Sequence, residues 1–463
     1  MTGLGNRVPL QSTLSGALLS YVPEGTDQDS ILLHPTAPRW AQVNRTTRQI
    51  VECLQAPGGG PETAAAFLVE EYGIPVETAR QDVTRVANDL ARKGLMDTEA
   101  PRTSGPRIGS MYLMLTERCN LACSHCFGSY PTRKEMALSK VLRLIDELIE
   151  GGGTSLVLSG GEPLLYPGLE AVVARIGKRI PVNFCTNGML LDDRWCSLFA
   201  RDLNASFQVS LDGPTAEIHD GIRGPNAFAG ALRGIRCLQD AGLGDRISLA
   251  ITIHSKIKDR LPEMTKLAED LGVKKIRFIP LRKVGRADET WSCTGQGIDV
   301  ATYEGIFDRY LMNPNVDGGQ VEVKCGMSGF SLEPSHEKHE DGHWCPVGRL
   351  LVVDPTGDTF PCVLMMQEAF RLGNIHTSSL QAITDGEAMA KVHAIKVSRE
   401  ETLAGCSACN WKNMCQSGCM ATALADKGTL MDVDDFCSYR DSSYRRAFDA
   451  LLASSGRSEP GKP

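Results

Sequence analysis

Apolar runs alternate with helical segments between Ser110 and about Arg286. Six of the runs are apolar enough to be parallel strands covered on both faces. They lie at residues 111–115, 155–159, 182–185, 207–211, 248–252 and 276–280. Six strand–helix units predict an α/β fold, an open or partial (β/α)6 barrel. In such folds the working residues lie on the loops that follow the strands.

The first 98 residues have a different pattern. Short strand-like runs at 30–34 and 40–44 are interrupted by prolines, and three helices follow. Apolar residues spaced by three and four predict one buried stripe on the third helix, ended by Gly94. The stripe consists of Val76, Ala79, Val83, Val86, Ala87 and Leu90. The order predicts a winged-helix-like module, and the Pro-, Ser- and Gly-containing stretch TEAPRTSGPR that follows suits a linker.

The chain from about residue 288 has weaker periodicity and many Cys, Gly and turn residues, which favours a domain held by metal more than by a large core. The expected segments are therefore 1–98, 108–287, 288–445 and a tail at 446–463.

Composition excludes several classes of protein. Hydrophobic residues make up 42% and charged residues 23%, as in soluble globular proteins. The net charge of −7 provides no global basic field for nucleic acid or an anionic membrane. The chain has no apolar run of about 18 residues, and its start lacks the features of a signal peptide. We therefore expect a cytoplasmic protein, in which sixteen cysteines favour metal ligation or catalysis over disulfides.

Three cysteines come directly after the first barrel strand. They are Cys119, Cys123 and Cys126, spaced C-x3-C-x2-C. Iron–sulfur cubanes usually have four thiolate ligands, so a three-thiolate loop leaves one iron open to another ligand. Zinc is the competing metal. Structural zinc favours two pairs of ligands, and no second pair follows at short range. His125 adjoins Cys126 and is an awkward fourth ligand.

The cysteine loop, with the motifs after the next three strands, resembles the radical S-adenosylmethionine superfamily. These motifs are Gly160-Gly161-Glu162-Pro163, Thr186-Asn187-Gly188 and Ser210-Leu211-Asp212-Gly213, with Arg223 and Gly224 close behind. The resemblance implies that the open iron chelates S-adenosylmethionine, which yields a 5′-deoxyadenosyl radical that abstracts hydrogen. The implied cofactor contacts are Gly160, Gly161, Glu162, Asn187, Ser210 and Arg223. Ser210 would contact the ribose or carboxylate and Arg223 the carboxylate, while small glycines would allow close approach to the ligand.

Seven cysteines near the C-terminus, the C-terminal cysteines, have their own spacing. They are Cys345, Cys362, Cys406, Cys409, Cys415, Cys419 and Cys437. The set resembles the SPASM extension of radical S-adenosylmethionine peptide modifiers, which implies two auxiliary [4Fe–4S] clusters and three in all. The implied first auxiliary set is Cys345, Cys362 and Cys419. The implied second set is Cys406, Cys409, Cys415 and Cys437.

The fourth ligand of the first auxiliary set has three options: Cys325, a histidine among His336, His339 and His343, or an open iron. Val363 stands where the sulfatase-maturing branch has an aspartate, which disfavours that branch. Most of the other cysteines are expected to be small buried hydrophobes. They are Cys53, Cys185, Cys196, Cys237, Cys293 and Cys325. Arg282, Lys283 and Arg286 could face the mouth of the active site, but a run of charges more often forms a solvated face.

The run SILLHPTAPRWAQVNRTTRQIVECL resembles the precursor-peptide recognition element of the chaperone in pyrroloquinoline quinone biosynthesis. The resemblance implies that a leader peptide adds to a strand edge near residues 30–34, beside the stripe of the third helix. Together the parts predict a maturase that cross-links or otherwise modifies a ribosomal precursor peptide, with a flavodoxin or ferredoxin as electron donor and with no nucleic-acid or membrane partner.

Two alternatives remain. The substrate could be a folded protein or the precursor of a peptide-derived cofactor, of pyrroloquinoline quinone or mycofactocin type. The other is a DNA-binding iron–sulfur sensor. DNA binding needs a one-sided basic stripe, but the third helix carries basic and acidic residues on a mixed face. The basic ones are Arg80, Arg85, Arg92 and Lys93, against Glu77, Asp82 and Asp89.

Overall fold

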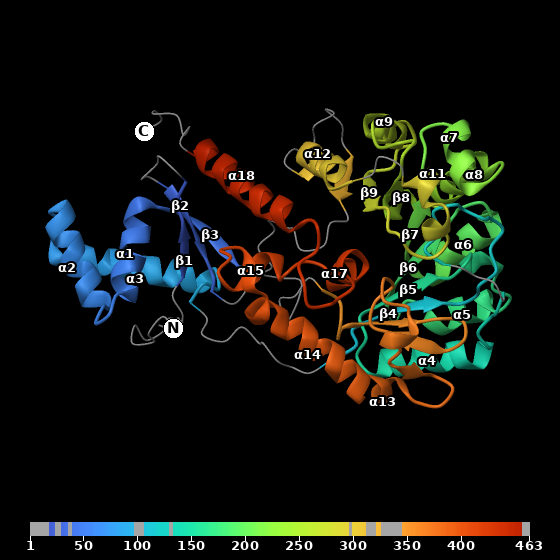
Figure 1. The fold of residues 1–463 in the computed structure, drawn as a ribbon, viewed down its shortest axis with the longest axis horizontal. Helices are drawn as coiled ribbons and strands as arrows, with labels where there is room; N and C mark the ends of the chain where they lie inside the picture. Colours follow the sequence, from blue (N-terminus) through green and yellow to red (C-terminus); the bar gives the residue numbers. More distant parts are fainter. Residues whose placement is uncertain are drawn as a thin grey trace, which may run out of the picture.

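The computed structural model describes residues 18–23, 29–35, 39–96, 106–128, 133–295, 299–311, 321–325 and 345–455. The N-terminal sheet and helices lie at one end of the molecule and the barrel at the other (Figure 1). Helices from the C-terminal part of the chain lie between them. Within the described ranges, no helix combines the length and the apolar content that crossing a bilayer requires.

The N-terminal module is a three-stranded antiparallel sheet followed by three helices, so the two predicted strands and the three helices are present and one further strand, β1, precedes them. The strands are β1 (Leu19–Tyr21), β2 (Asp29–Leu33) and β3 (Trp40–Asn44), and the helices are α1 (Arg45–Gln55), α2 (Pro61–Tyr72) and α3 (Val76–Arg92). The side chain of Asn44 caps α1 by accepting a 2.8 Å hydrogen bond from the amide of Thr47. Arg39 donates to the carbonyl of Gly94, so the start of β3 is tied to the end of α3.

Two expectations for this module are wrong. The strand near residues 30–34 is no edge, because β2 pairs with β1 on one side and β3 on the other. The three-residue β1 is too short to be predicted from its sequence. The stripe of α3 is buried in the module's own core rather than open as a groove. Val76 departs from the stripe and is 50% exposed, since it starts the helix directly after Pro75.

Six parallel strands form the barrel in chain order, and all six runs predicted from the sequence are strands. They are β4 (Ser110–Met114), β5 (Ser155–Ser159), β6 (Pro181–Thr186), β7 (Asn204–Ser210), β8 (Ile247–Ile253) and β9 (Lys275–Pro280). The connecting helices are α4 (Leu138–Glu150), η1 (Pro163–Leu165), α5 (Leu169–Ile176), α6 (Asp193–Asp202), α7 (Ala216–Arg223), α8 (Ala227–Asp240), η2 (Gly244–Arg246) and α9 (Leu261–Asp270). Their apolar faces and the strands form the largest core.

The sheet continues past the barrel at both ends. The strand β10 (Glu322–Cys325) pairs in parallel with β9, and β11 (Leu350–Val353) pairs in parallel with β4. Two short antiparallel strands, β12 (Asp358–Phe360) and β13 (Gly373–Asn374), complete it. Residues of β11 also join the barrel's core, so packing holds part of the C-terminal region, where we expected metal to matter more than a large core.

The rest of the C-terminal region is helical. The elements are α10 (Arg286–Glu289), α11 (Trp291–Thr294), α12 (Val300–Leu311), η3 (Glu368–Phe370), α13 (Leu380–Thr384), α14 (Glu387–Thr402), α15 (Ala404–Ser407), α16 (Lys412–Cys415), α17 (Met420–Lys427) and α18 (Cys437–Ser455). Helix α18 starts at the last of the C-terminal cysteines and passes beside β2 (Figure 1). It continues past the boundary that we expected at residue 445.

An aromatic group joins the N-terminal sheet to the C-terminal region. Trp411 lies 5.1 Å from Tyr21 and 5.5 Å from Phe448, measured between ring centroids. Trp40 meets Phe448 edge-on at 5.1 Å, and Tyr444 stacks on Trp411 at 5.6 Å. We call these five rings the aromatic seat. Cys409 and Cys415 pack against the same group, so the N-terminal module rests directly on the segment that carries two of the C-terminal cysteines.

Candidate active site and auxiliary cysteine sites

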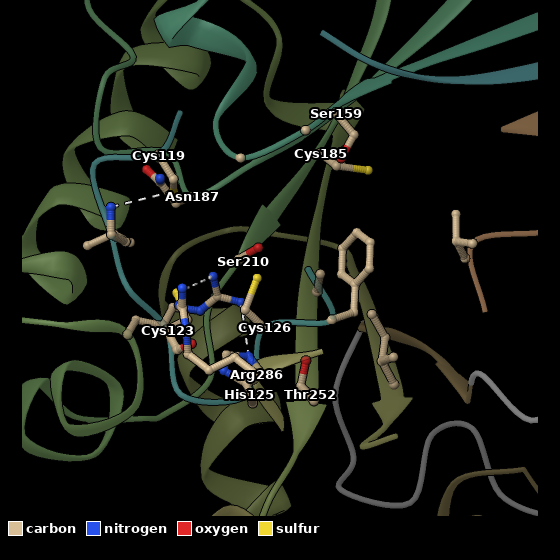
Figure 2. A pocket seen from close by; sticks show the side chains of 18 of the residues that line it. Cys119, Cys123, His125, Cys126, Ser159, Cys185, Asn187, Ser210, Thr252 and Arg286 are labelled. Atoms are coloured by element: carbon tan, nitrogen blue, oxygen red, sulfur yellow. Dashed lines mark hydrogen bonds between the residues drawn. The ribbon is translucent and has the colours of Figure 1, made fainter. Parts of the chain in front are cut away.

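A cavity of about 440 Å³ lies at the carboxyl-terminal side of the barrel strands. Cys119, Cys123 and Cys126 all line it (Figure 2). Five of the six residues expected to contact the cofactor line it too: Gly160, Gly161, Asn187, Ser210 and Arg223. The three strand-end motifs and the cysteine loop therefore converge on one cavity.

The cysteine loop, residues 119–126, is held by backbone contacts to distant segments. The amide of Ser124 donates to the carbonyl of Ile222 at 2.9 Å. Arg286 donates to the carbonyl of Cys123 at 3.0 Å, and the hydroxyl of Thr290 donates to the carbonyl of Ser124 at 2.6 Å. These contacts come from the α7 and α10–α11 segments. The loop therefore keeps its shape without using the thiols for its own support.

The thiols of the loop suit a metal-bound group. All three are free, with Cys119 exposed, Cys126 half-buried and Cys123 buried. Although Cys119 as a whole residue is exposed, desolvation of its thiol raises the pKa to about 11, and burial raises the pKa of Cys123. Such thiols are protonated at neutral pH unless a cation stabilises the thiolates, as iron does. Within the described ranges, no three His, Cys, Asp or Glu side chains are placed to hold a single metal ion.

The glycines of the GGEP motif have a role that differs from the expected one. A Cβ atom on Gly160 would lie 2.4 Å from the carbonyl oxygen of Thr116, and one on Gly161 would lie 2.3 Å from that of Arg118. Gly160 also has a φ of +135°. The close approach that requires glycine is thus to the backbone leading into the cysteine loop, although both residues also line the cavity.

Glu162 does not line the cavity, and its side chain is fully buried. Its carboxylate accepts hydrogen bonds from the amide of Asn187 at 2.9 Å and the hydroxyl of Thr186 at 2.8 Å. Burial outweighs these bonds and raises the pKa of Glu162 to about 7. In this structure Glu162 joins the loop after β5 to the loop after β6 and so helps to place Asn187. A contact of Glu162 with the cofactor stays a prediction.

Asp212 binds three residues that line the cavity: Arg223, His125 and Thr252. Its fully buried carboxylate lies 2.5 Å from Nε of Arg223 and 2.8 Å from Nε2 of His125. It also accepts a 2.7 Å hydrogen bond from the amide of Thr252. Burial would raise the pKa of Asp212, but Arg223 and His125 outweigh it and hold the pKa well below the usual range. The pair leaves Nη1 of Arg223 3.8 Å from Sγ of Cys123.

Cys185 belongs to the cysteines of which most were expected to be buried hydrophobes, yet it lines the cavity (Figure 2). Arg282 and Arg286 line it too, which is the less favoured of the two positions expected for them. Alternate side chains of a barrel strand face the interior. Along β6 the buried residues Val182 and Phe184 alternate with Cys185, so the period could have placed this thiol inside. Cys293 is exposed, also unlike our expectation.

The C-terminal region closes part of the cavity. Val363 and Leu364, directly after Cys362, contribute to its lining. An apolar side chain therefore occupies the position at which the sulfatase-maturing branch was expected to have its aspartate. The location of Val363 makes that sequence difference relevant to the chemistry of the cavity.

The C-terminal cysteines fall into two spatial groups. Cys345, Cys362 and Cys419 pack around one apolar group, and burial, with the neighbouring thiols of this group, raises the pKa of Cys345 and Cys362. The other group is Cys406, Cys409, Cys415 and Cys437, in which burial and the neighbouring thiols raise the pKa of Cys409, Cys415 and Cys437. The members of each group are those of one set that the resemblance implied, and their role as ligands stays a prediction. Cys325 ends β10 beside β9, and the three candidate histidines lie outside the described residues.

Three family patterns match the chain in order. Residues 29–96 match coenzyme PQQ synthesis protein D, residues 113–268 match the radical SAM superfamily, and residues 345–410 match the SPASM iron–sulfur cluster-binding domain. Mycofactocin maturase MftC of Mycobacterium ulcerans is 31% identical over 320 residues, which are 66% of this chain and 81% of that protein. An AdoMet-dependent heme synthase of Methanosarcina barkeri is 29% identical over 361 residues, 73% and 98% of the two chains.

A solved structure with the same fold is SuiB of Streptococcus suis bound to S-adenosylmethionine. It has a TM-score of 0.59 at 14% identity, covering 92% of this chain and 98% of SuiB. Taken with the convergence of the strand-end motifs and the cysteine loop on one cavity, these matches show that the chain belongs to the radical SAM superfamily and carries a SPASM iron–sulfur cluster-binding domain and a PqqD-type domain.

Proposed function

We propose that this protein is a radical S-adenosylmethionine maturase that installs a cross-link or related modification in a ribosomally made precursor peptide. One observation carries the proposal. The cavity that gathers three free thiols has walls from both the barrel and the C-terminal region, and the PqqD-type module rests on that same C-terminal region. The C-terminal region thus contacts both the proposed radical site and the proposed peptide-recognition module.

In the proposed site Cys119, Cys123 and Cys126 hold a [4Fe–4S] cluster, and Asn187, Ser210 and Arg223 contact S-adenosylmethionine. When bound and reduced, this pair supplies a 5′-deoxyadenosyl radical that abstracts hydrogen from the peptide. The chain's own residues position the peptide and exclude water. The apolar lining suits that task, and it includes Leu121, Phe127, Ile279, Leu281, Val363 and Leu364.

The C-terminal cysteines hold two auxiliary [4Fe–4S] clusters in this proposal, in the two spatial groups described above. The three-ligand group takes its fourth ligand from Cys325, from a histidine in the segment before Cys345, or from substrate. Iron analysis of Cys325→Ala separates the first option from the others. A flavodoxin or ferredoxin delivers the reducing electron. The predicted segments 1–98, 108–287 and 288–445 stay part of the proposal, while helix α18 joins the last of them to the start of the tail expected at 446–463.

The peptide's leader binds the N-terminal module as an added strand. The described sheet has β1 and β3 as its outer strands, so these replace the expected edge at β2. Docking raises the effective concentration of the core peptide at the cavity, so modest leader affinity suffices. SuiB, whose fold this chain shares, has been solved bound to its precursor peptide SuiA.

The second candidate is a precursor of a peptide-derived cofactor, and the likeness to a mycofactocin maturase favours it over a folded-protein substrate. It keeps the same chemistry and differs in the size and fate of the product. A DNA-binding sensor is disfavoured, because basic side chains of α3 pair with acids. Arg80 pairs with Glu62 at 2.9 Å and Arg85 with Asp82 at 2.7 Å.

The test uses the full-length chain, because an isolated module would expose the sheet face that contacts the aromatic seat. Small reading frames beside the gene supply candidate peptides. A reconstituted reaction with S-adenosylmethionine and a reductant should yield a product lighter by two hydrogens for a ring-forming cross-link. The same core peptide without its leader should react poorly. Stronger binding of duplex DNA than of any candidate leader would contradict the proposal.

A further inference from the structure

A buried ion pair lies between the two groups of C-terminal cysteines. Arg440 of α18 and Asp434 have side chains that are 2% and 1% exposed. Nη2 of Arg440 lies 2.5 Å from Oδ1 of Asp434, and Nη1 donates to Oδ2 at 3.2 Å. This two-pronged geometry fixes the guanidinium plane. Burying two charges costs free energy that their pairing only partly offsets, which suggests that this pair has a role besides stability.

Asp434 holds the backbone next to both groups. Its Oδ2 accepts a 2.8 Å hydrogen bond from the amide of Cys419, which belongs to the first group. Its own carbonyl accepts a 3.1 Å hydrogen bond from the amide of Cys437, which belongs to the second. One residue thus holds the backbone of a cysteine in each group.

Arg440 contacts the second group directly. Its Nε donates to Sγ of Cys415 at 3.2 Å. The guanidinium charge thus lies directly against this sulfur, and a charge-assisted hydrogen bond of this kind is stronger than a neutral one.

The turn that joins the two groups is shaped around this pair. Gln416, Ser417 and Gly418 follow one another between Cys415 and Cys419, with φ angles of +53°, +61° and +67°. Two successive non-glycine residues in this region are unusual and costly. A Cβ on Gly418 would lie 2.1 Å from Nη2 of Arg440, so a larger residue there would displace the guanidinium.

We propose that Arg440 is a positioning residue that tunes the second auxiliary cluster by hydrogen-bonding the thiolate of Cys415, while Asp434 fixes it relative to the first auxiliary site. The inference rests on the ligand sets of the proposed function. Hydrogen bonds and positive charge at the sulfurs stabilise the reduced, more negative cluster and raise its reduction potential. Burial keeps solvent from screening the effect.

The test compares reduction potentials and needs no peptide. A chain in which Cys119, Cys123 and Cys126 are all alanine leaves only the C-terminal sites to titrate. In that background we compare Arg440→Gln, Arg440→Lys and the control Arg446→Gln. Arg446 lies on the same helix, is 45% exposed and pairs with Asp308. Iron content is measured first and should be about eight per chain.

Arg440→Gln should make reduction of the second cluster about tenfold less favourable, about 59 mV for one electron. Arg440→Lys should shift it less, and Arg446→Gln not at all. An unchanged midpoint in an iron-replete Arg440→Gln chain would overturn the proposal. If that variant loses iron, the lysine variant decides by the same criterion. Loss of iron in both would assign Arg440 a structural role instead, and a parent chain without about eight irons would refute the ligand sets themselves.

Discussion

The cysteine loop and the C-terminal cysteines are supported in opposite ways. The three thiols of the loop lie within eight residues on one segment, and Cys119 is exposed at the cavity. The C-terminal cysteines are spread from Cys345 to Cys437 over several segments. The aromatic seat and the Arg440–Asp434 pair pack against them. The first site opens onto the cavity, whereas the C-terminal cysteines are all half-buried or buried, and we call their surroundings the enclosed region.

This difference separates two requirements. A site that binds a cofactor and a substrate needs an open face. The cysteine loop and Arg223 are therefore held by other parts of the chain, namely by Arg286, by Asp212 and by the backbone of neighbouring loops. The segments that carry the C-terminal cysteines are instead packed against other parts of the chain, and the segment with Cys409 and Cys415 also supports the N-terminal sheet. The two regions should therefore respond differently to the same perturbations.

The largest effect is expected from Cys126→Ala. Removing one of three thiolates should abolish reductive cleavage of S-adenosylmethionine, by more than the roughly 100-fold that changes around a metal site cause. Because the C-terminal cysteines lie on other segments, about eight of about twelve irons should stay bound. Quantifying 5′-deoxyadenosine and iron checks both statements. Cleavage of S-adenosylmethionine by the variant at the wild-type rate would refute the role of the loop.

Trp411→Ala should open the enclosed region. Trp411 is 1% exposed at the centre of the aromatic seat, and deleting such a side chain costs about 3–5 kcal/mol. Chemical denaturation should report this loss. Iron should also leave the second cysteine group sooner, because Cys409 and Cys415 pack on the same rings. Trp195→Ala, on α6 of the barrel, is the matched control, and equal iron loss from both variants would count against the enclosed-site view.

Glu162→Gln tests the support behind the open site through its pH dependence. The ordinary pKa of 4.5 is raised to about 7 in the fold, so the folded chain favours the protonated acid. Stability from this group is complete below pH 4.5 and is lost as the pH rises through 7. At about 1.36 kcal/mol per pH unit, the wild type should lose about 3 kcal/mol across this window. The stability of the glutamine variant should lack this dependence on pH. Equal losses of stability in the two proteins between pH 4.5 and 7 would contradict the prediction.

The smallest effect is a difference in rate between the two regions of the unmodified protein. A chelator should remove iron from the cysteine loop several-fold faster than from the C-terminal cysteines, because opening an enclosed site requires local unfolding. Adding S-adenosylmethionine should slow only the faster phase. A single phase for all the iron would show that enclosure does not control release.

The two regions also differ in how far the sequence predicts them. The barrel strands and the C-x3-C-x2-C loop are predictable because their signals are local: short apolar runs, and ligands a few residues apart. The strand β1 has three residues and β13 has two, too few for any period. The contact between Arg440 and Cys415 spans 25 residues and depends on how α18 packs, which spacing does not encode.

Charge was the least predictable property. Arg282 and Arg286 carry the sequence signal of a solvated face, yet the loop after β9 turns them toward the cavity. Asp212 was noted only as part of a motif, and its central position between Arg223 and His125 follows from the meeting of β7, α7 and the cysteine loop. Such tertiary contacts determine which charges are buried, so pattern alone does not reveal them.

The shared use of the segment around Trp411 has a consequence for how the protein matures. Residues 409–415 carry thiols of the second group and also form the surface on which the N-terminal sheet rests. If these thiols hold iron as proposed, we expect iron insertion and the docking of the N-terminal sheet to depend on each other. We expect a chain that has not yet received its metal to recruit precursor poorly, so that the peptide is directed to molecules able to process it.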